Sequence, residues 1–297
     1  MVTEQHFGGN WTEDKLIRVN KYLSAYTIAL KAQPFELFYI DAFAGTGYRS
    51  LEKKSKNKNT TNEANLEFPE FADIETIKFL EGSARKALQV VPKFDKYIFI
   101  EKAKGYFREL EKIKADFPEC EKDITVIHSD ANTAVRNFCS NLASYQRAVM
   151  FLDPYGMQVP WDTIEIIAET KKIDLWYLFP LGMGVNRLLK KDSNKIDELE
   201  KQKLDELFGT TNWTDAFYKT VTTTGLFGSE ERIEKGSFFD ISQYFVKRLD
   251  TIFAGVAPNP LILRNSKNSP LYLLCFAASN EKGAKIAVKI AKNILGK

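Results

Sequence analysis

Five short apolar runs, each followed by polar or helical sequence, most constrain how this chain can fold. They span residues 35–40, 97–100, 124–127, 148–152 and 173–179. Runs that are apolar at nearly every position suit strands buried on both faces, as in a parallel sheet. The segments at about 103–116, 131–143 and 161–170 are predicted helices, which supply the crossovers between parallel strands. The sequence therefore predicts an α/β fold with a mostly parallel sheet and helices on both faces.

Both ends of the chain extend this pattern. Apolar residues recur every three or four positions from Leu16 to Leu30, which predicts an amphipathic helix capped by Thr12 and ended by Pro34. Strand-like runs at 261–263 and 271–276 suit an antiparallel hairpin. Five strands and this hairpin make a predicted seven-stranded sheet, and the layout resembles that of class I S-adenosylmethionine-dependent methyltransferases, a Rossmann-like fold.

Two segments interrupt the alternation of strands and helices. Residues 48–68 form a predicted loop insertion, and the charged stretch at about 182–235 a predicted helical insertion. We therefore expect an N-terminal helical segment over 1–34 and a methyltransferase-like domain over 35–297.

The loop insertion is basic, although the chain as a whole has a formal net charge of only +3. Arg49, Lys53 and Lys54 are among its cations and are candidates for contact with a nucleic-acid phosphate backbone. The alternative is an ordinary solvated loop. The small net charge does not indicate a protein that coats nucleic acid.

Cysteine and histidine counts argue against disulfides and metal sites. The cysteines Cys120, Cys139 and Cys275 are far apart, and the only histidines are His6 and His128. The sequence begins without an apolar signal and has no apolar stretch long enough to span a membrane. We expect a cytoplasmic protein without a membrane partner, a metal or disulfides, in which most of the aromatic residues are core.

The strongest motif is Asp41-Ala-Phe-Ala-Gly-Thr-Gly47, which follows the first apolar run. Glycines let backbone approach a ligand closely, and ligands of open α/β sheets lie beyond the carboxyl ends of the strands. The run resembles methyltransferase motif I, with Asp41, Gly45 and Gly47 as candidate cofactor residues and Phe43 where many members have glycine. The alternative is a tight strand–helix turn without a ligand.

Acidic residues also follow the next two strand-like runs. Glu101 can accept hydrogen bonds from both hydroxyls of a ribose, and it matches the motif II acid by resemblance. Asp130, followed by Ala131, matches a position that often contacts adenine, but it can equally cap the next helix. We therefore expect these residues to help to hold S-adenosylmethionine; a surface acid is the alternative for Glu101.

Asp153-Pro154-Tyr155-Gly156 follows the fourth run. By resemblance to the methyltransferases, it stands at the motif IV position, where methyl transfer takes place. The segment looks like the Asp-Pro-aromatic-Gly form of tRNA guanine-N2 dimethyltransferases. Asp153 and the Pro154 carbonyl would accept hydrogens of an exocyclic amine, and Tyr155 would stack on the base. A Pro-Gly turn with an incidental aspartate is the alternative.

The whole chain resembles the three-Cys-motif partner (TcmP) family. The resemblance rests on Trp11-Thr-Glu-Asp-Lys15, the Ile40–Gly47 turn, Phe99-Ile-Glu101, Phe151–Gly156 and the Leu271–Ala278 strand. It implies a methyltransferase-like fold and a protein partner that carries the three cysteines.

These patterns favour an S-adenosylmethionine-dependent methyltransferase that acts on an exocyclic amine of a nucleobase in DNA or RNA. The alternative is a catalytically inactive module of the same fold that binds a protein partner or nucleic acid. A nucleotide-dependent oxidoreductase is a third reading, weakened because the chain has no Gly-x-Gly-x-x-Gly.

Overall fold

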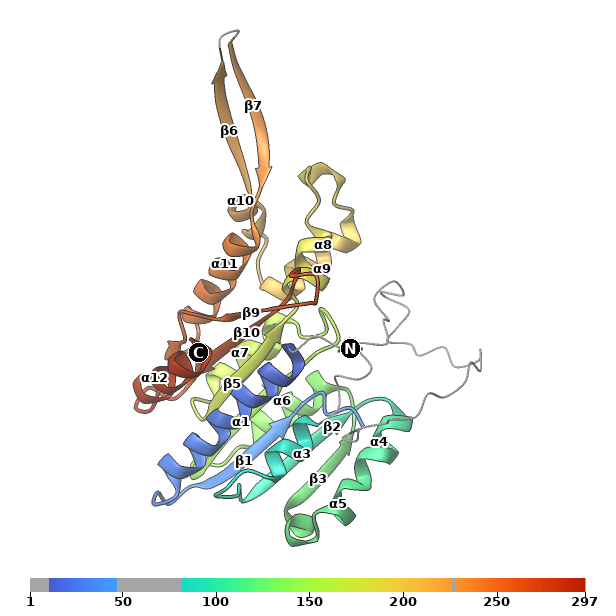
Figure 1. Ribbon diagram of the computed structural model, residues 1–297, viewed down its shortest axis with the longest axis vertical. Helices are drawn as coiled ribbons and strands as arrows, with labels where there is room; N and C mark the ends of the chain where they lie inside the picture. The colour runs from blue at the N-terminus through green and yellow to red at the C-terminus, as the bar shows by residue number, and fades with distance from the viewer. Residues whose placement is uncertain (1–10, 47–81, 226–227, 297) are drawn as a thin grey trace, which may run out of the picture. The chain divides into compact units, whose positions relative to one another are not determined.

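The computed structural model describes residues 11–46, 82–225 and 228–296 (Figure 1). The chain divides into two compact units. The first runs through Tyr155 and also includes residues 264–267, and the second contains the rest of the chain. The division into 1–34 and 35–297 stays a prediction, and the loop insertion 48–68 lies outside the described residues.

The first unit contains four parallel strands in the order β3-β2-β1-β4. They are β1 (Glu36–Asp41), β2 (Lys96–Glu101), β3 (Ile124–His128) and β4 (Gln146–Leu152). Phe38 aligns with Lys96 of β2 on one side and with Ala148 of β4 on the other. This order places the carboxyl ends of the strands at one edge, where the predicted site residues follow them.

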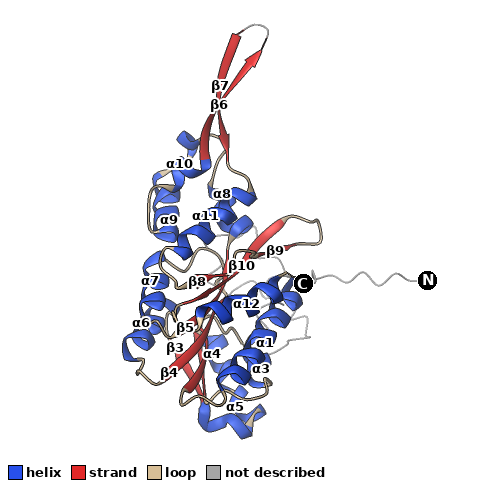
Figure 2. Ribbon diagram, turned by 90° about the vertical axis from the view of Figure 1, so that its left-hand side faces the viewer, coloured by secondary structure: helices blue, strands red, loops and turns tan. Residues whose placement is uncertain are grey.

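The helices of the first unit lie on both sides of these strands. They are α1 (Trp11–Leu30), α3 (Ser83–Leu88), α4 (Lys104–Glu111), α5 (Ile113–Asp116) and α6 (Ala131–Asn141). Figure 2 shows α1 and α3 on one side and α6 on the other. The helix expected over 103–116 is divided between α4 and α5. The prediction that Thr12 caps the first helix is wrong, because α1 already begins at Trp11.

Four strands of the second unit complete the main sheet. They are β5 (Ile173–Phe179), β8 (Gly255–Val256), β9 (Leu261–Arg264) and β10 (Pro270–Ala278). β10 is antiparallel to both β5 and β8, and β9 also pairs with β10. The predicted α/β fold with a mostly parallel sheet and a C-terminal hairpin is confirmed. The sheet has eight strands rather than seven, because two-residue β8 is too short to leave a pattern in the sequence.

The insertion expected to be helical is only partly so. It contains a π-helical turn (Leu181–Val185) and the helices α8 (Asn186–Leu188), α9 (Glu198–Phe208) and α10 (Trp213–Phe217). The prediction is wrong from Tyr218 onward, where β6 (Tyr218–Gly225) and β7 (Gly228–Lys235) form a separate antiparallel hairpin (Figure 2). β6 contains the run Thr220-Val-Thr-Thr-Thr, and β-branched residues favour strands.

An aromatic cluster forms the core of the second unit. The remaining helices of the second unit are α7 (Trp161–Glu169), α11 (Phe238–Asp250) and α12 (Ala284–Leu295). The rings of Phe179 on β5 and Phe245 on α11 stack with centroids 3.9 Å apart. The Arg248 guanidinium lies 4.3 Å from the centre of the Trp161 ring. The buried aromatic side chains of both units agree with the predicted aromatic core.

The three cysteines are free and buried. In the parts of the chain that the structure describes, no helix has the length and apolar character needed to cross a membrane. Those same parts contain no group of three or more His, Cys, Asp or Glu residues arranged to hold a metal ion.

Candidate functional site

Asp41 ends β1 with its side chain completely buried. Its Oδ1 atom accepts a hydrogen bond from the Phe43 backbone N–H at 3.3 Å, which closes the turn after the strand. Its buried Oδ2 atom has no hydrogen-bond partner among the described residues. A buried carboxylate oxygen is normally hydrogen-bonded, so this oxygen can accept from a donor outside the described residues.

Burial raises the pKa of Asp41 from 3.8 to about 7. Hydrogen bonding with the Ser83 hydroxyl lowers the pKa, the neighbouring carboxylate of Asp153 raises it, and the Phe43 N–H and the Lys15 ammonium lower it. Desolvation is the largest of these effects, because a charged carboxylate loses most by leaving water. The Asp41 side chain is therefore divided between its acid and ionised forms near neutral pH.

The predicted glycine turn contacts the predicted motif II acid, because the Gly45 backbone N–H donates a hydrogen bond to Glu101. Gly45 has a φ of 61°, a left-handed conformation that favours glycine. Burial raises the pKa of the Glu101 carboxyl above its usual value, and hydrogen bonds from the backbone N–H groups of Ala103 and Gly45 offset part of that rise. Glu101 also accepts a hydrogen bond from the Ala103 N–H at 2.6 Å. The end of β2 is thus joined to the turn that follows β1.

Asp130 occupies the helix-capping position. Its Oδ1 atom accepts hydrogen bonds from the backbone N–H groups of Asn132 at 3.0 Å and Thr133 at 3.3 Å, at the start of α6. Lys102 Nζ lies 3.5 Å from Asp130 Oδ2. Ala131 follows as a buried residue. Helix capping explains the hydrogen bonds of Asp130 Oδ1. A contact between Asp130 and a cofactor stays a prediction.

Asp153 follows β4 and forms a buried ion pair with a residue that the sequence did not single out for chemistry. Lys15 Nζ of α1 lies 2.5 Å from Asp153 Oδ2, and the two side chains are 3% and 8% exposed. The structure shows no hydrogen bond from a described residue to Asp153 Oδ1. Pro154 is buried and Tyr155 is half-buried.

Asp41 and Asp153 belong to one buried electrostatic cluster in the first unit. β1 and β4 are adjacent, and Asp41 aligns with Phe151, two residues before Asp153. Burial raises the pKa of Tyr39 well above its usual value, and the carboxylates of Asp41 and Asp153 raise it further. Tyr39 therefore stays neutral, and Lys15 is the buried cation that the described residues supply to this cluster.

Lys15, Tyr39 and Ser83 are the members of this cluster that sequence reasoning missed. A signal for Lys15 was present, because it lies four residues before Val19 on the apolar stripe of α1. A lysine in such a stripe indicates a buried acidic partner, although it does not say which one. Ser83 carried no comparable signal.

Several candidate residues are not placed. Gly47, Arg49, Lys53 and Lys54 lie outside the described residues. The Phe43 side chain is half-buried, at the position where many methyltransferases have glycine.

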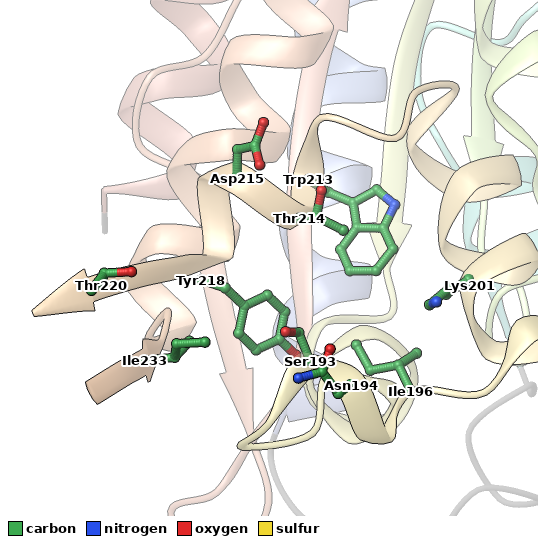
Figure 3. A pocket seen from close by; sticks show the side chains of 10 residues that line it. All are labelled: Ser193, Asn194, Ile196, Lys201, Trp213, Thr214, Asp215, Tyr218, Thr220 and Ile233. Atoms are coloured by element: carbon green, nitrogen blue, oxygen red, sulfur yellow. The ribbon is translucent and has the colours of Figure 1, made fainter. Parts of the chain in front are cut away.

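A separate cavity of about 330 Å³ lies in the second unit and contains none of these residues. Figure 3 shows it between the hairpin root and the segment that precedes α9, with the rings of Trp213 and Tyr218 and the side chains of Ile196 and Lys201 around it. The Trp213 indole N–H donates to Asp205 and the Tyr218 hydroxyl to the Lys190 carbonyl, so both polar ends are occupied by the protein.

Comparison with known proteins gives likeness of fold alone. No family model matches the chain, and no curated protein matches it. Protein LPL1258 from Legionella pneumophila is 15% identical, with coverage of 98% of this chain and 92% of that chain and a TM-score of 0.47. Magnesium protoporphyrin IX methyltransferase from Synechocystis, with bound S-adenosylhomocysteine, is 12% identical, with coverage of 90% and 86% and a TM-score of 0.33.

Proposed function

We propose that this protein is an S-adenosylmethionine-dependent methyltransferase that acts on an exocyclic amine of a nucleobase in DNA or RNA. The observation that carries the proposal is the placement of Asp41 and Asp153 at the carboxyl ends of adjacent parallel strands, where a buried oxygen of Asp41 has no partner among the described residues. Ligands of open α/β sheets bind at this end of the strands. The contact between Gly45 and Glu101 supports a nucleoside site at the same edge.

The residues present fit the cofactor. In the proposed site, Asp41 would accept a hydrogen bond from a polar or cationic group of the cofactor, and Glu101 would accept hydrogen bonds from the ribose hydroxyls. The turn at Gly45 would let the cofactor approach the backbone closely. Asp130 and Ala131 would lie along its base. When bound, S-adenosylmethionine supplies an electrophilic methyl group.

The chain's own task would be to orient the acceptor nitrogen. Asp153 Oδ2 is fixed by Lys15, so Oδ1 and the Pro154 carbonyl would accept the two amine hydrogens. This would direct the nitrogen lone pair toward the methyl group, and Tyr155 would stack on the base. Most of the rate enhancement would come from positioning.

The experiment separates binding from turnover. We expect Asp41→Ala to abolish cofactor binding in calorimetric titration, whereas Asp153→Ala keeps it and lowers methyl transfer by about 100-fold or more. Transfer is measured with radiolabelled cofactor and fractionated cellular DNA, RNA and protein. Asp123→Ala, which removes a surface ion pair with Lys96 in the same unit, is the control and is expected to change neither quantity.

Unchanged cofactor affinity in Asp41→Ala would contradict this placement of the site. The second candidate function is an inactive binding module, and the buried ion pair that occupies Asp153 favours it. Cofactor binding without methyl transfer to any fraction would support that module.

We also propose membership in the three-Cys-motif partner family, with a protein partner that carries the cysteines. This proposal rests on the sequence segments described above, which include Lys15 and Asp153.

A further inference from the structure

The hairpin of β6 and β7 leaves the outer edge of each strand unpaired. Among the described residues these two strands pair with each other and with no further strand. Figure 1 and Figure 2 both show the hairpin projecting beyond α10 and α11 of the same unit. The backbone groups of an unpaired edge can bind another strand, and proteins usually prevent this with charged residues, proline or a bulge.

The register of the hairpin shows which backbone groups lie at the outer edge of β6. The Gly236 N–H donates to the Phe217 carbonyl at 2.6 Å, so these two residues form a hydrogen-bonded pair at the root. Hydrogen-bonded and non-hydrogen-bonded pairs alternate along an antiparallel ladder. Thr220 and Thr222 lie an odd number of positions beyond Phe217, so their N–H and C=O groups point away from β7. Both threonines are exposed.

The two edges differ in charge. The charged residues of β7 are Glu230, Glu231, Arg232, Glu234 and Lys235. β6 has no charged residue after Lys219, and its run from Thr220 to Thr224 is β-branched at every position. Such residues favour strands. The edge of β6 therefore lacks the protection by charge that β7 has.

The charge balance of the hairpin argues against nucleic acid as the molecule that covers this edge. Acidic and basic residues are equal in number over the two strands, so the hairpin has no net positive charge to attract phosphates. The edge instead suits an uncharged strand rich in β-branched residues. The chain itself contains such a strand, which is β6.

We propose that β6 pairs edge to edge with β6 of a second copy of this chain, in antiparallel orientation about a two-fold axis at Thr222. In this register Thr220 faces Thr224 of the second copy, and Thr222 faces its own equivalent. Each of these pairs exchanges both backbone hydrogen bonds, because the groups of Thr220 and Thr222 point outward. Lys219 faces Gly225 of the second copy, so the register opposes no like charges.

The contact is self-complementary, as a two-fold interface requires. It joins the two hairpins into one sheet with β6 strands at its centre and the charged β7 strands at its edges. Threonines that face each other across strands contribute favourably to such a sheet. The proposal is independent of the proposed function, because it uses no residue of the candidate site.

Sedimentation equilibrium of the full chain tests this contact. We expect the wild type to dimerise below about 100 µM. Thr222→Lys and Thr222→Glu should each weaken dimerisation by about tenfold or more, because like charges then face each other across the axis. An equimolar mixture of the two variants should restore the dimer, because opposite charges then face each other.

Ile233→Lys is the matched control. Ile233 lies on β7 with its side chain 49% exposed, so this substitution adds the same charge to the strand that the contact does not use. We expect Ile233→Lys to dimerise as the wild type does.

Three outcomes would overturn the proposal. A wild type that is monomeric at about 100 µM would leave the edge to a strand of a different protein. A dimer that survives Thr222→Lys, or one that the mixture of variants fails to restore, would show that the axis does not lie at Thr222. If the monomer binds a DNA duplex and Thr222→Glu weakens that binding, the hairpin contacts nucleic acid instead.

Discussion

A carboxyl group completely buried at position 41 makes folding depend on pH. The pKa of Asp41 is raised from 3.8 to about 7, so the folded chain holds a proton that the unfolded chain has already lost between these values. The folded state is therefore favoured below about pH 4, and this contribution is lost as the pH rises through about 7. Each pKa unit corresponds to about 1.4 kcal/mol.

We expect Asp41→Asn to unfold at a higher temperature than the wild type at about pH 8, because asparagine avoids the cost of burying a charge. The gain in unfolding free energy should be of the order of 1–4 kcal/mol at about pH 8 and should shrink toward about pH 5. Thermal unfolding across this range measures it. A difference between the two proteins that stays constant with pH would contradict the stated pKa.

The buried ion pair between Lys15 and Asp153 predicts a second stability effect. Lys15→Met leaves a buried carboxylate without its partner and should lower the unfolding free energy by about 3–5 kcal/mol. The double variant Lys15→Met/Asp153→Leu should recover most of that loss, because no charge is then stranded. Urea unfolding measures both.

Lys96→Met is the matched control for this pair. Lys96 pairs with Asp123 at 2.8 Å, but the two side chains are 39% and 40% exposed, so its loss should cost at most about 1 kcal/mol. Equal losses for Lys15→Met and Lys96→Met would show that burial does not control the strength of these pairs.

At the residue scale, the sequence located the acids but not their surroundings. Asp41, Glu101, Asp130 and Asp153 each follow a strand-like run, and parallel strands bring such positions to one edge. The ion pair of Lys15 with Asp153 joins residues far apart in the chain, and pattern periodicity carries no information about such a pair.

At the scale of elements, prediction succeeded where the pattern was long. The apolar runs predicted β1 to β5, β9 and β10, and the four predicted helical segments overlap α1, α4 with α5, α6 and α7. The two-residue strand β8 and the hairpin of β6 and β7 were missed. β6 is Thr-rich and not apolar, and it pairs only with β7, so the alternation typical of a half-buried sheet is absent.

The end of α9 supplies a prediction at this scale. Gly209 has a φ of 62°, and a Cβ atom there would lie 2.1 Å from Cδ1 of the Trp161 ring. Gly209→Ala therefore combines backbone strain with overpacking against a buried ring, and we expect a loss of about 2–4 kcal/mol in urea unfolding.

Gly105→Ala is the control for this substitution. Gly105 lies in α4 with open space around its Cβ position, so alanine should stabilise the chain by about 0.5–1 kcal/mol. A stable Gly209→Ala protein would show that the Trp161 ring can move aside.

At the scale of the whole molecule, the described candidate site residues all belong to the first unit. The fold class followed from the order of elements, since alternating strands and helices permit few arrangements. The net charge of +3 did not reveal the basic segment, because the charge of that segment is summed with a near-neutral remainder of the chain. The acceptor stays a prediction, since no described side chain distinguishes one nucleobase from another.

Lys15 and Asp153 are separated by 138 positions. A ribosome adds about 5–20 residues per second, so Asp153 is synthesised about 7–28 s after Lys15. During that interval Lys15 has no carboxylate partner, so its burial against the sheet is unfavourable and the helix is not held in place by this ion pair. We therefore expect α1 to take its final place on the sheet only after Asp153 has been synthesised.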